Sequence, residues 1–246
     1  MDRMLYVAMA GAKETLRAQA VNNHNIANVS TTGFKADLAA FQSRAVDGSG
    51  FASRVYAQNT TTGWNPNSGS LHSTGRDLDI ALHGEGWIAV QGADGKEAYT
   101  RAGDLQLDPA GALVTATGHP VLGDGGPVVV PPYTSLFFAR DGSISIVAQG
   151  QGPETTSTIG RLKLVNPPGE QLTRGDDGLF RMKDGSDAPA DAAVQVASGV
   201  LETSNVNAAE AMVNMIELAR HFEMQVKAIR NAEENGAAAA QLMRLG

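Results

Sequence analysis

The two ends of the chain carry apolar residues at helical spacing, whereas the residues between them alternate with the two-residue period of a β-strand. Residues 2–28 contain no proline. Their apolar seam steps by four and three residues, as in a coiled coil with two polar interruptions. Residues 30–33 (STTG) end the pattern, so one long N-terminal helix is predicted. The seam comprises Leu5, Met9, Ala12, Leu16, Gln19, Asn23 and Ile26.

The C-terminal segment repeats the same spacing. Asn205 or Asn207 is a candidate N-cap, and Glu210 would lie in the first turn. Gly236 is expected to weaken the end of this helix. Since neither helix can cover its apolar stripe alone, we expect the two to pack on each other or on other copies. The second seam comprises Ala208, Ala211, Met215, Leu218, Phe222, Gln225, Ile229 and Ala232.

The middle of the chain is predicted to be all β. Short strands are expected at residues 78–82, 87–90, 105–107, 128–130, 143–146 and 162–165. Turns with positive φ are expected at the Asp-Gly pairs that begin at Asp47, Asp94, Asp124, Asp141, Asp177 and Asp184.

The predicted fold class is therefore α+β, with the long terminal helices packed as a coiled-coil-like domain and an all-β domain inserted between them. The discontinuous helical domain would comprise residues 1–35 and 205–246, and the β-domain residues 75–204. Residues 47–74 are rich in Ser, Asn, Thr and Gly, and residues 36–74 are predicted to be an extended connector.

Charge and cysteine content exclude several functions. The net charge of −7 argues against binding to nucleic acid or anionic membranes, which draws on clustered Lys and Arg. The absence of Cys excludes disulfides and thiolate chemistry. The sequence contains no run of about 18 apolar residues, so no membrane-spanning helix is predicted. Charged residues at positions 2, 3, 13 and 14 leave no room for the apolar core of a cleaved signal peptide.

No metal or cofactor is predicted. The five histidines lie far apart in sequence and form no ligand motif; they are His24, His72, His83, His119 and His221. Residues 84–89 (GEGWIA) match a loose dinucleotide fingerprint, but they continue as a strand instead of opening a helix. A glycine-rich hairpin is therefore expected there.

Asp77 and Asp79 form the one candidate catalytic pair. Two carboxylates spaced by two residues on a strand would lie about 7 Å apart, a separation compatible with glycoside hydrolysis in the cell envelope. No nucleophile motif accompanies them, and a role in a tight turn is favoured, so no catalytic residue is assigned. A surface adhesin with a stalk shares the composition but does not explain matched seams at both termini.

Four asparagines gather near the end of the first predicted helix: Asn22, Asn23, Asn25 and Asn28. Asparagine is a poor residue for a helix interior because its side chain competes for backbone partners. The residues could cap a frayed helix end, or they could form a polar ladder that fixes the register of a neighbouring helix. The sequence leaves both interpretations open.

Five blocks of the sequence resemble the signatures of bacterial flagellar axial proteins, the family of rod, hook and hook-associated subunits. They are residues 25–35 (NIANVSTTGFK), 73–87 (STGRDLDIALHGEGW), 99–103 (YTRAG), 198–207 (SGVLETSNVN) and 215–223 (MIELARHFE). One departure is His24-Asn25-Ile26, where the family usually has Asn-Asn-Leu. Residues 1–9, 174–181 and 222–227 most resemble subunits of the proximal rod, and distal rod subunits are the nearest alternative.

The resemblance implies a non-enzymatic structural subunit that assembles helically into the rod, which transmits torque from rotor to hook. It implies export through the flagellar type III apparatus without a cleaved signal peptide, and residence in the periplasm. The expected partners are other rod proteins axially and copies of the same chain laterally. The helical domain would line the rod channel, and the β-domain would lie outside it.

The residues expected at the interfaces between subunits come from both ends of the chain. In the N-terminal segment they are Leu5, Met9, Leu16, Asn23, Asn25, Ile26, Asn28, Gly33 and Phe34. In the C-terminal segment they are Asn205, Asn207, Met215, Leu218, Phe222 and Ile229.

Overall fold

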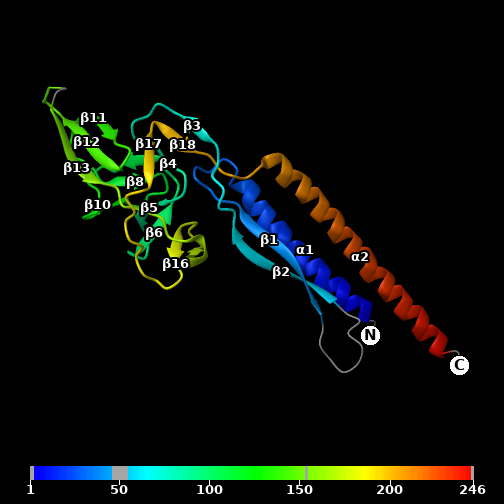
Figure 1. Cartoon of the computed structure of the whole chain (residues 1–246). Helices are drawn as coiled ribbons and strands as arrows, with labels where there is room; N and C mark the ends of the chain where they lie inside the picture. The colour runs from blue at the N-terminus through cyan, green and yellow to red at the C-terminus, as the bar shows by residue number, and fades with distance from the viewer. Residues whose placement is uncertain (1–2, 46–54, 153–154, 245–246) are drawn as a thin grey trace. The chain divides into compact units, whose positions relative to one another are not determined.

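The computed structural model describes residues 3–45, 55–152 and 155–244 (Figure 1). The chain divides into two units. The helical unit comprises the described residues within 1–29, 36–65 and 206–246. The β unit comprises those within 30–35 and 66–205. Residues 30–35 therefore group with the strands, although they were expected to belong to the helical domain.

The helical unit is built around α1 (Arg3–Ala27) and α2 (Ala208–Arg244). Both predicted helices are confirmed. They lie side by side and run antiparallel, as two close approaches show (Figure 1). A Cβ on Gly11 would lie 3.0 Å from the side chain of Gln225. Eleven residues further along α1, the Asn22 side chain donates to the carbonyl of Ala211.

The N-cap of α2 is Asn207. Its Oδ1 accepts hydrogen bonds from the backbone N–H groups of Ala209 at 3.1 Å and Glu210 at 3.3 Å. These bonds satisfy two of the donors that a helix leaves unpaired at its start. Of the two candidates, Asn207 is thus the cap, and α2 continues through Gly236 to Arg244.

The predicted connector is wrong for most of its length. Within it, β1 (Asp37–Ala45) and β2 (Val55–Trp64) form an antiparallel hairpin that lies along α1 (Figure 1). These strands carry few large apolar residues, so they lack the alternation by which a half-buried strand is recognised. The two strands pair through their backbones, and both contact α1. Asp47 lies outside the described residues.

The β unit consists of antiparallel ladders. Its largest sheet has the order β14-β5-β6-β16-β15, and a second has the order β11-β12-β13. The strands are β3 (Leu71–Ser73), β4 (Ile80–His83), β5 (Trp87–Gln91), β6 (Glu97–Thr100), β7 (Leu105–Leu107), β8 (Leu113–Thr115), β9 (Leu122–Gly123), β10 (Gly126–Pro127), β11 (Tyr133–Phe138), β12 (Ser143–Ala148), β13 (Thr156–Arg161), β14 (Leu164–Val165), β15 (Leu172–Arg174), β16 (Phe180–Met182), β17 (Gln195–Ser198) and β18 (Val200–Glu202). A short 3₁₀ helix spans Gly169–Gln171.

Most of the predicted strands are present with shifted bounds. The exception is residues 128–130, which form no strand and contribute only an isolated bridge between Ala112 and Val129. The Asp-Gly turns beginning at Asp94, Asp141, Asp177 and Asp184 each place their glycine at positive φ, as predicted. The turn at Asp124 does not, because Gly126 rather than Gly125 adopts positive φ.

The last strands of the β unit pair with its first. Strand β17 pairs with β4, and β18 pairs with β3. The chain therefore leaves the unit beside the point where it enters. This closure joins residues about 110–130 positions apart in sequence, from Leu71↔Glu202 to His83↔Gln195.

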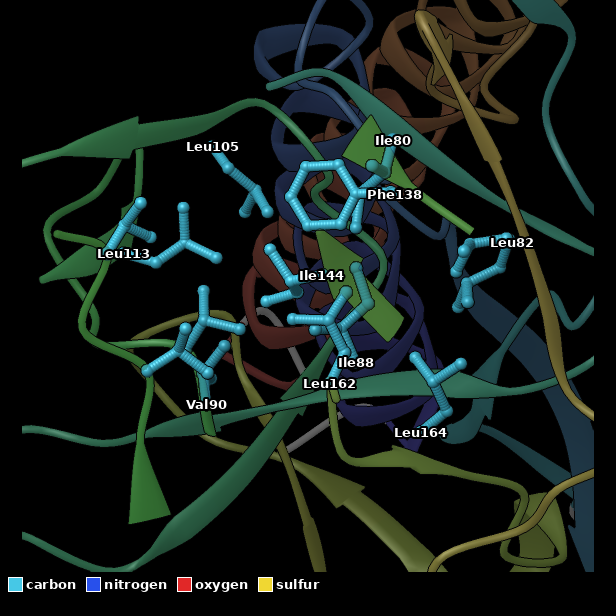
Figure 2. Packing of buried hydrophobic residues seen from close by; sticks show 14 of the residues in the cluster. Ile80, Leu82, Ile88, Val90, Leu105, Leu113, Phe138, Ile144, Leu162 and Leu164 are labelled. Atoms are coloured by element: carbon cyan, nitrogen blue, oxygen red, sulfur yellow. The ribbon is translucent and has the colours of Figure 1, made fainter. Parts of the chain in front are cut away.

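The core of the β unit is mainly aliphatic. Figure 2 shows its side chains converging from several ladders around Phe138. Ile88, Leu105 and Leu113 are fully buried. Burial of such side chains contributes about 1.5–3 kcal/mol each, so this cluster is a major source of the stability of the β unit.

Gly103 is required for the close approach of two backbone segments in the β unit. The N–H of Ile80 donates to the carbonyl of Gly103 at 2.9 Å. A Cβ on Gly103 would overlap the carbonyl oxygen of Ile80. We predict that Gly103→Ala lowers the free energy of unfolding by at least about 2 kcal/mol, since backbone cannot move aside as a side chain can.

Gly160→Ala is the matched control, because nothing lies within 4 Å of a Cβ there and φ is not positive. We expect that substitution to change the free energy of unfolding by less than about 1 kcal/mol. Urea denaturation of both full-length variants measures the difference. Equal stability of the two would show that the close approach at Gly103 is relaxed at little cost.

Candidate functional site

Three of the signature blocks meet in an ion cluster inside the β unit. The carboxylate of Glu202 binds Lys35 Nζ through Oε1 at 2.9 Å and Arg101 Nε through Oε2 at 2.7 Å. Lys35, Arg101 and Glu202 are 1%, 4% and 1% exposed. Because buried charges are costly unless paired and hydrogen-bonded, this cluster is stable only when all three side chains are present.

Backbone groups complete the hydrogen bonds of the cluster. Gly69 N–H donates to Glu202 Oε1 at 2.9 Å, and Lys35 Nζ also donates to the carbonyl of Asn67 at 2.8 Å. The two terminal nitrogens of Arg101 donate to the carbonyls of Gly84 and Gly86. The GEGWIA segment thus begins with carbonyls that bind a guanidinium, and it continues into β5 as expected.

Burial lowers the pKa of Lys35 below its ordinary value, and the hydrogen bond to Glu202 opposes this shift. The protonated amine therefore depends on the carboxylate beside it. Removing the carboxylate would leave two buried cations facing each other without a counter-charge.

Gly33 allows residues 30–35, the first segment of the chain to enter the β unit, to pack closely against the cluster. Its φ is 65°, in the left-handed region that favours glycine, and a Cβ there would overlap the carbonyl of Arg101. Its N–H donates to the carbonyl of Glu202 at 2.8 Å. The glycine of the first signature block thus has a packing role within one subunit, and its place at a contact between subunits stays a prediction.

Cation–π contacts anchor the same segment, residues 30–35. The guanidinium of Arg174 lies between the rings of Phe34 and Phe180, 4.6 and 4.9 Å from their centroids. Arg174 Nη2 also donates to the carbonyl of Lys35 at 2.7 Å, and Trp87 contacts Phe180 with ring centroids 4.4 Å apart. Cation–π contacts of this kind contribute about 0.5–2 kcal/mol each. Phe34 is therefore engaged within its own subunit.

Asn205 belongs to the same junction. Its backbone N–H donates to the carbonyl of Phe34, and its Nδ2 donates to the carbonyl of Asn67 at 2.7 Å. The outgoing segment at residues 30–35 and the returning segment at residues 198–205 are thus bonded to each other within the β unit.

Sequence reasoning missed the ion cluster. It found the blocks that contain Lys35, Arg101 and Glu202 but assigned these side chains no partners. The available signal was a charged residue inside each of three otherwise weakly charged blocks. Sequence alone could not show that the three meet, because 167 positions separate Lys35 from Glu202.

The two carboxylates of Asp77 and Asp79 lie in different surroundings. Asp77 is exposed, whereas Asp79 is 3% exposed, accepts from Thr74 Oγ1 at 2.7 Å and pairs with Arg76 at 3.2 Å. Asp79 N–H bonds to the carbonyl of Arg76, so the segment is a turn. The favoured interpretation, a structural role in a tight turn, is confirmed. Within the described residues, no group of three or more His, Asp or Glu side chains is placed to hold a metal.

The predicted seam of α1 is covered in part by the rest of the helical unit. The residues buried against the rest of the helical unit are small or polar: Ala8, Ala12, Glu14, Thr15 and Ala18. Leu5, Ile26 and Asn25 are half-buried, and Asn23 is exposed. Met9 and Leu16, placed in the seam by sequence, are 52% and 49% exposed. Small residues allow neighbouring elements to approach closely, which leaves the larger side chains outside.

The predicted seam of α2 corresponds to its covered face. Ala211 and Ala232 are buried, and Leu218, Phe222 and Ile229 are half-buried. Met215 lies at the edge of this face and is 37% exposed. Large apolar residues also remain on the opposite face, where Met212, Val213, Ile216 and Met224 are exposed. Both helices therefore carry apolar surface that the described residues leave exposed.

The asparagines make contacts of both predicted kinds, a cap at the helix end and a bond to the neighbouring helix. Asn22 Nδ2 donates to the carbonyl of Ala211 on α2 at 2.8 Å, which is a bond to a neighbouring helix. Asn25 exchanges two bonds with the backbone of Asp37 at the start of β1. Asn28 Nδ2 donates to the carbonyl of His24 and caps the helix end.

At the position where the sequence departs from the family signature, His24 Nδ1 lies 2.7 Å from Asp37 Oδ2. His24 and Asn25 therefore both contact the first residue of β1. This pair ties the end of α1 to the hairpin.

A membrane span is not found among the helices of the described residues, since none is both long and apolar enough to cross a bilayer.

We predict that Asn22→Ala lowers the free energy of unfolding of the helical unit by about 1 kcal/mol more than Asn23→Ala does. Both substitutions remove the same poor helix former, so their difference isolates the bond to Ala211. Urea denaturation monitored by far-ultraviolet circular dichroism gives both values. Identical values would mean that this bond contributes nothing to helix pairing.

We predict that Glu202→Gln lowers the free energy of unfolding of the β unit by about 3–5 kcal/mol, because it leaves Lys35 and Arg101 buried without a counter-charge. Glu85→Gln, an exposed change of the same kind in the same unit, serves as the control and should cost less than about 0.5 kcal/mol. A Glu202→Gln chain as stable as the control would contradict the assigned role of the cluster.

Three family models match the sequence. They are the flagella basal body rod protein over residues 5–35, the flagellar hook protein FlgE/F/G D1 domain over residues 81–151, and the flagellar basal body rod FlgEFG protein C-terminal over residues 197–242. Each matched segment contributes one member of the ion cluster: Lys35, Arg101 and Glu202 respectively.

Curated relatives match over the full length of the chain. The flagellar basal-body rod proteins FlgF of Salmonella typhimurium and of Escherichia coli are each 45% identical, covering 100% of both chains. A flagellar basal-body rod protein FlgG of Buchnera aphidicola is 34% identical over 91% of this chain and 94% of its own. The chain therefore belongs to the FlgF family of flagellar basal-body rod proteins.

Proposed function

We propose that the chain is a structural, non-catalytic subunit of the proximal part of the flagellar rod. It assembles helically into the shaft that transmits torque from rotor to hook. The observation that carries this proposal is the apolar surface that the paired helices leave uncovered. On α1 it includes Met9 and Leu16, and on α2 it includes Met212, Val213 and Ile216.

Burial of these side chains between subunits supplies the driving force for assembly. Fully burying a Met, Leu, Val or Ile side chain contributes about 1.5–3 kcal/mol relative to leaving it in water. The free energy is offset in part by the loss of translational and rotational freedom on association. When the two contacting surfaces differ, successive subunits need not close into a ring, and an open helical array results.

Transmission of torque requires that subunits neither slip nor unfold under load. The length of α1 and α2 spreads each contact over many helical turns. In the β unit, the ion cluster and the stack around Arg174 bond the outgoing and returning segments to each other. These bonds keep the outgoing segment, residues 30–35, and the returning segment, residues 198–205, together when force is applied along the chain.

The finer parts of the proposal rest on the family resemblance. The axial partners are other rod proteins, and the lateral partners are copies of the same chain. The chain passes unfolded through the flagellar type III export apparatus without a cleaved signal peptide, and the rod that it joins lies in the periplasm. The full-length similarity to FlgF relatives favours a proximal over a distal position. Coiled-coil packing of the helices and their place along the rod channel are part of the same proposal.

We predict that Leu16→Asp abolishes rod assembly while the isolated chain stays folded. Leu16 is half exposed in the single chain, so a charge there is tolerated by the monomer but would be buried in the assembly. Swimming of a strain whose own gene is replaced by the variant gives the readout. Circular dichroism of the purified chain checks the fold.

Val129→Asp is the matched control, since Val129 is an exposed apolar residue of the β unit. We expect this variant to swim normally. Normal swimming by the Leu16→Asp strain, with the variant present in its basal bodies, would contradict the proposed role of the α1 face.

A further inference from the structure

Helix α2 is longer than its partner. Gly11 lies opposite Gln225, and an α-helix rises about 1.5 Å per residue, so Arg3 at the start of α1 is level with roughly residue 233 of α2. Ala232 is 1% exposed, whereas residues 233–241 are all exposed. Figure 1 shows the C-terminal end of α2 running past the first turn of α1. We call residues 233–244 the overhang.

The pattern of the covered face continues into the overhang. The steps of four and three residues that connect Leu218, Phe222, Gln225, Ile229 and Ala232 continue to Gly236 and Ala239. The stripe that is covered up to Ala232 thus continues, exposed, for about two turns beyond the level of Arg3, where α1 begins. Gly236 and Ala239 would allow another helix to approach as closely as the small residues of α1 allow within the chain.

A surface of complementary shape and charge exists on α1. Met9 and Leu16, seven residues apart, form its outer stripe, and both are half exposed. Lys13 is exposed beside them, whereas the overhang begins with Glu233 and Glu234, also exposed. In the described part of the chain, none of these three charged side chains makes an ion pair.

We infer that the overhang of one copy packs against the outer stripe of α1 in a second copy. The large side chains of Met9 and Leu16 lie over Gly236 and Ala239, and Lys13 lies near Glu233 and Glu234. This inference rests on the proposed function and specifies one of its contacts. Since overhang and stripe are different surfaces, each copy can use both at once, and copies join head to tail without a two-fold axis.

The same chain cannot make this contact with itself. In the antiparallel pair, Leu16 is level with roughly residue 220 of α2, so Ala239 lies about 28 Å further along the helix. A disulfide needs Cα atoms within about 7 Å of each other. Cysteines at positions 16 and 239 can therefore be bridged only between copies.

Cysteine cross-linking tests the inference, because the chain has no cysteine of its own. The full-length double variant Leu16→Cys/Ala239→Cys is expressed in place of the natural chain, and isolated basal bodies are oxidised. Non-reducing electrophoresis should show a ladder of dimers, trimers and larger species. Each single variant should give at most trace dimer, and the control Leu16→Cys/Val129→Cys should give no ladder.

A double variant that enters basal bodies and supports swimming, yet cross-links no more than the single variants, overturns the inference and leaves the proposed function standing. Oxidising a mixture of the two purified single variants at high concentration gives a second readout. The inference predicts a heterodimer in excess of either homodimer, and an absence of this excess counts against it. Absence of the unsubstituted chain from basal bodies would instead contradict the proposed function.

Discussion

The antiparallel pairing of α1 with α2 is the constraint on which the rest of the structure depends. The two helices lie at opposite ends of the chain, so every residue between them must leave the pair and return to it. Part of that intervening chain forms the hairpin β1–β2 along α1, and the remainder forms the β unit. Because the pair buries mainly small side chains, such as Ala12 and Ala18, the larger apolar residues remain on the outside, where another subunit can bury them.

In the β unit, the outgoing segment at residues 30–35 and the returning segment at residues 198–205 are bonded to each other. One carboxylate, Glu202, accepts from Lys35 on the outgoing segment, from Arg101 in the interior and from the backbone of Gly69. A buried group of this kind tolerates no missing partner, since an unpaired charge in the interior costs several kcal/mol. Strand pairing of β18 with β3 acts at the same place. The family signatures thus mark contacts within one subunit as well as surfaces for assembly.

Periodicity predicted the elements whose patterns are local. The 3.6-residue period located both helices, and the two-residue period located most strands. Residue type limited the cap of α2 to Asn205 or Asn207, and the structure shows that it is Asn207. The hairpin β1–β2 was missed because its strands lack the alternation of apolar and polar residues by which a half-buried strand is recognised. The predicted seam of α1 is only partly covered within the single chain, since Ala12 is buried whereas Met9 and Leu16 are about half exposed. The ion cluster could not be predicted, since it unites three residues that only the tertiary fold brings together.

The central claim is that the outer faces of the paired helices are covered only in the assembled rod. Oxidation of methionine in isolated basal bodies and in the purified chain tests it directly, because Met9, Met212 and Met224 are each about half exposed in the single chain. The account predicts that Met9 and at least one of the two methionines on α2 are oxidised much more slowly in basal bodies, while the half-buried Met182 of the β unit is unchanged. Equal oxidation of all these methionines in the two preparations would contradict it.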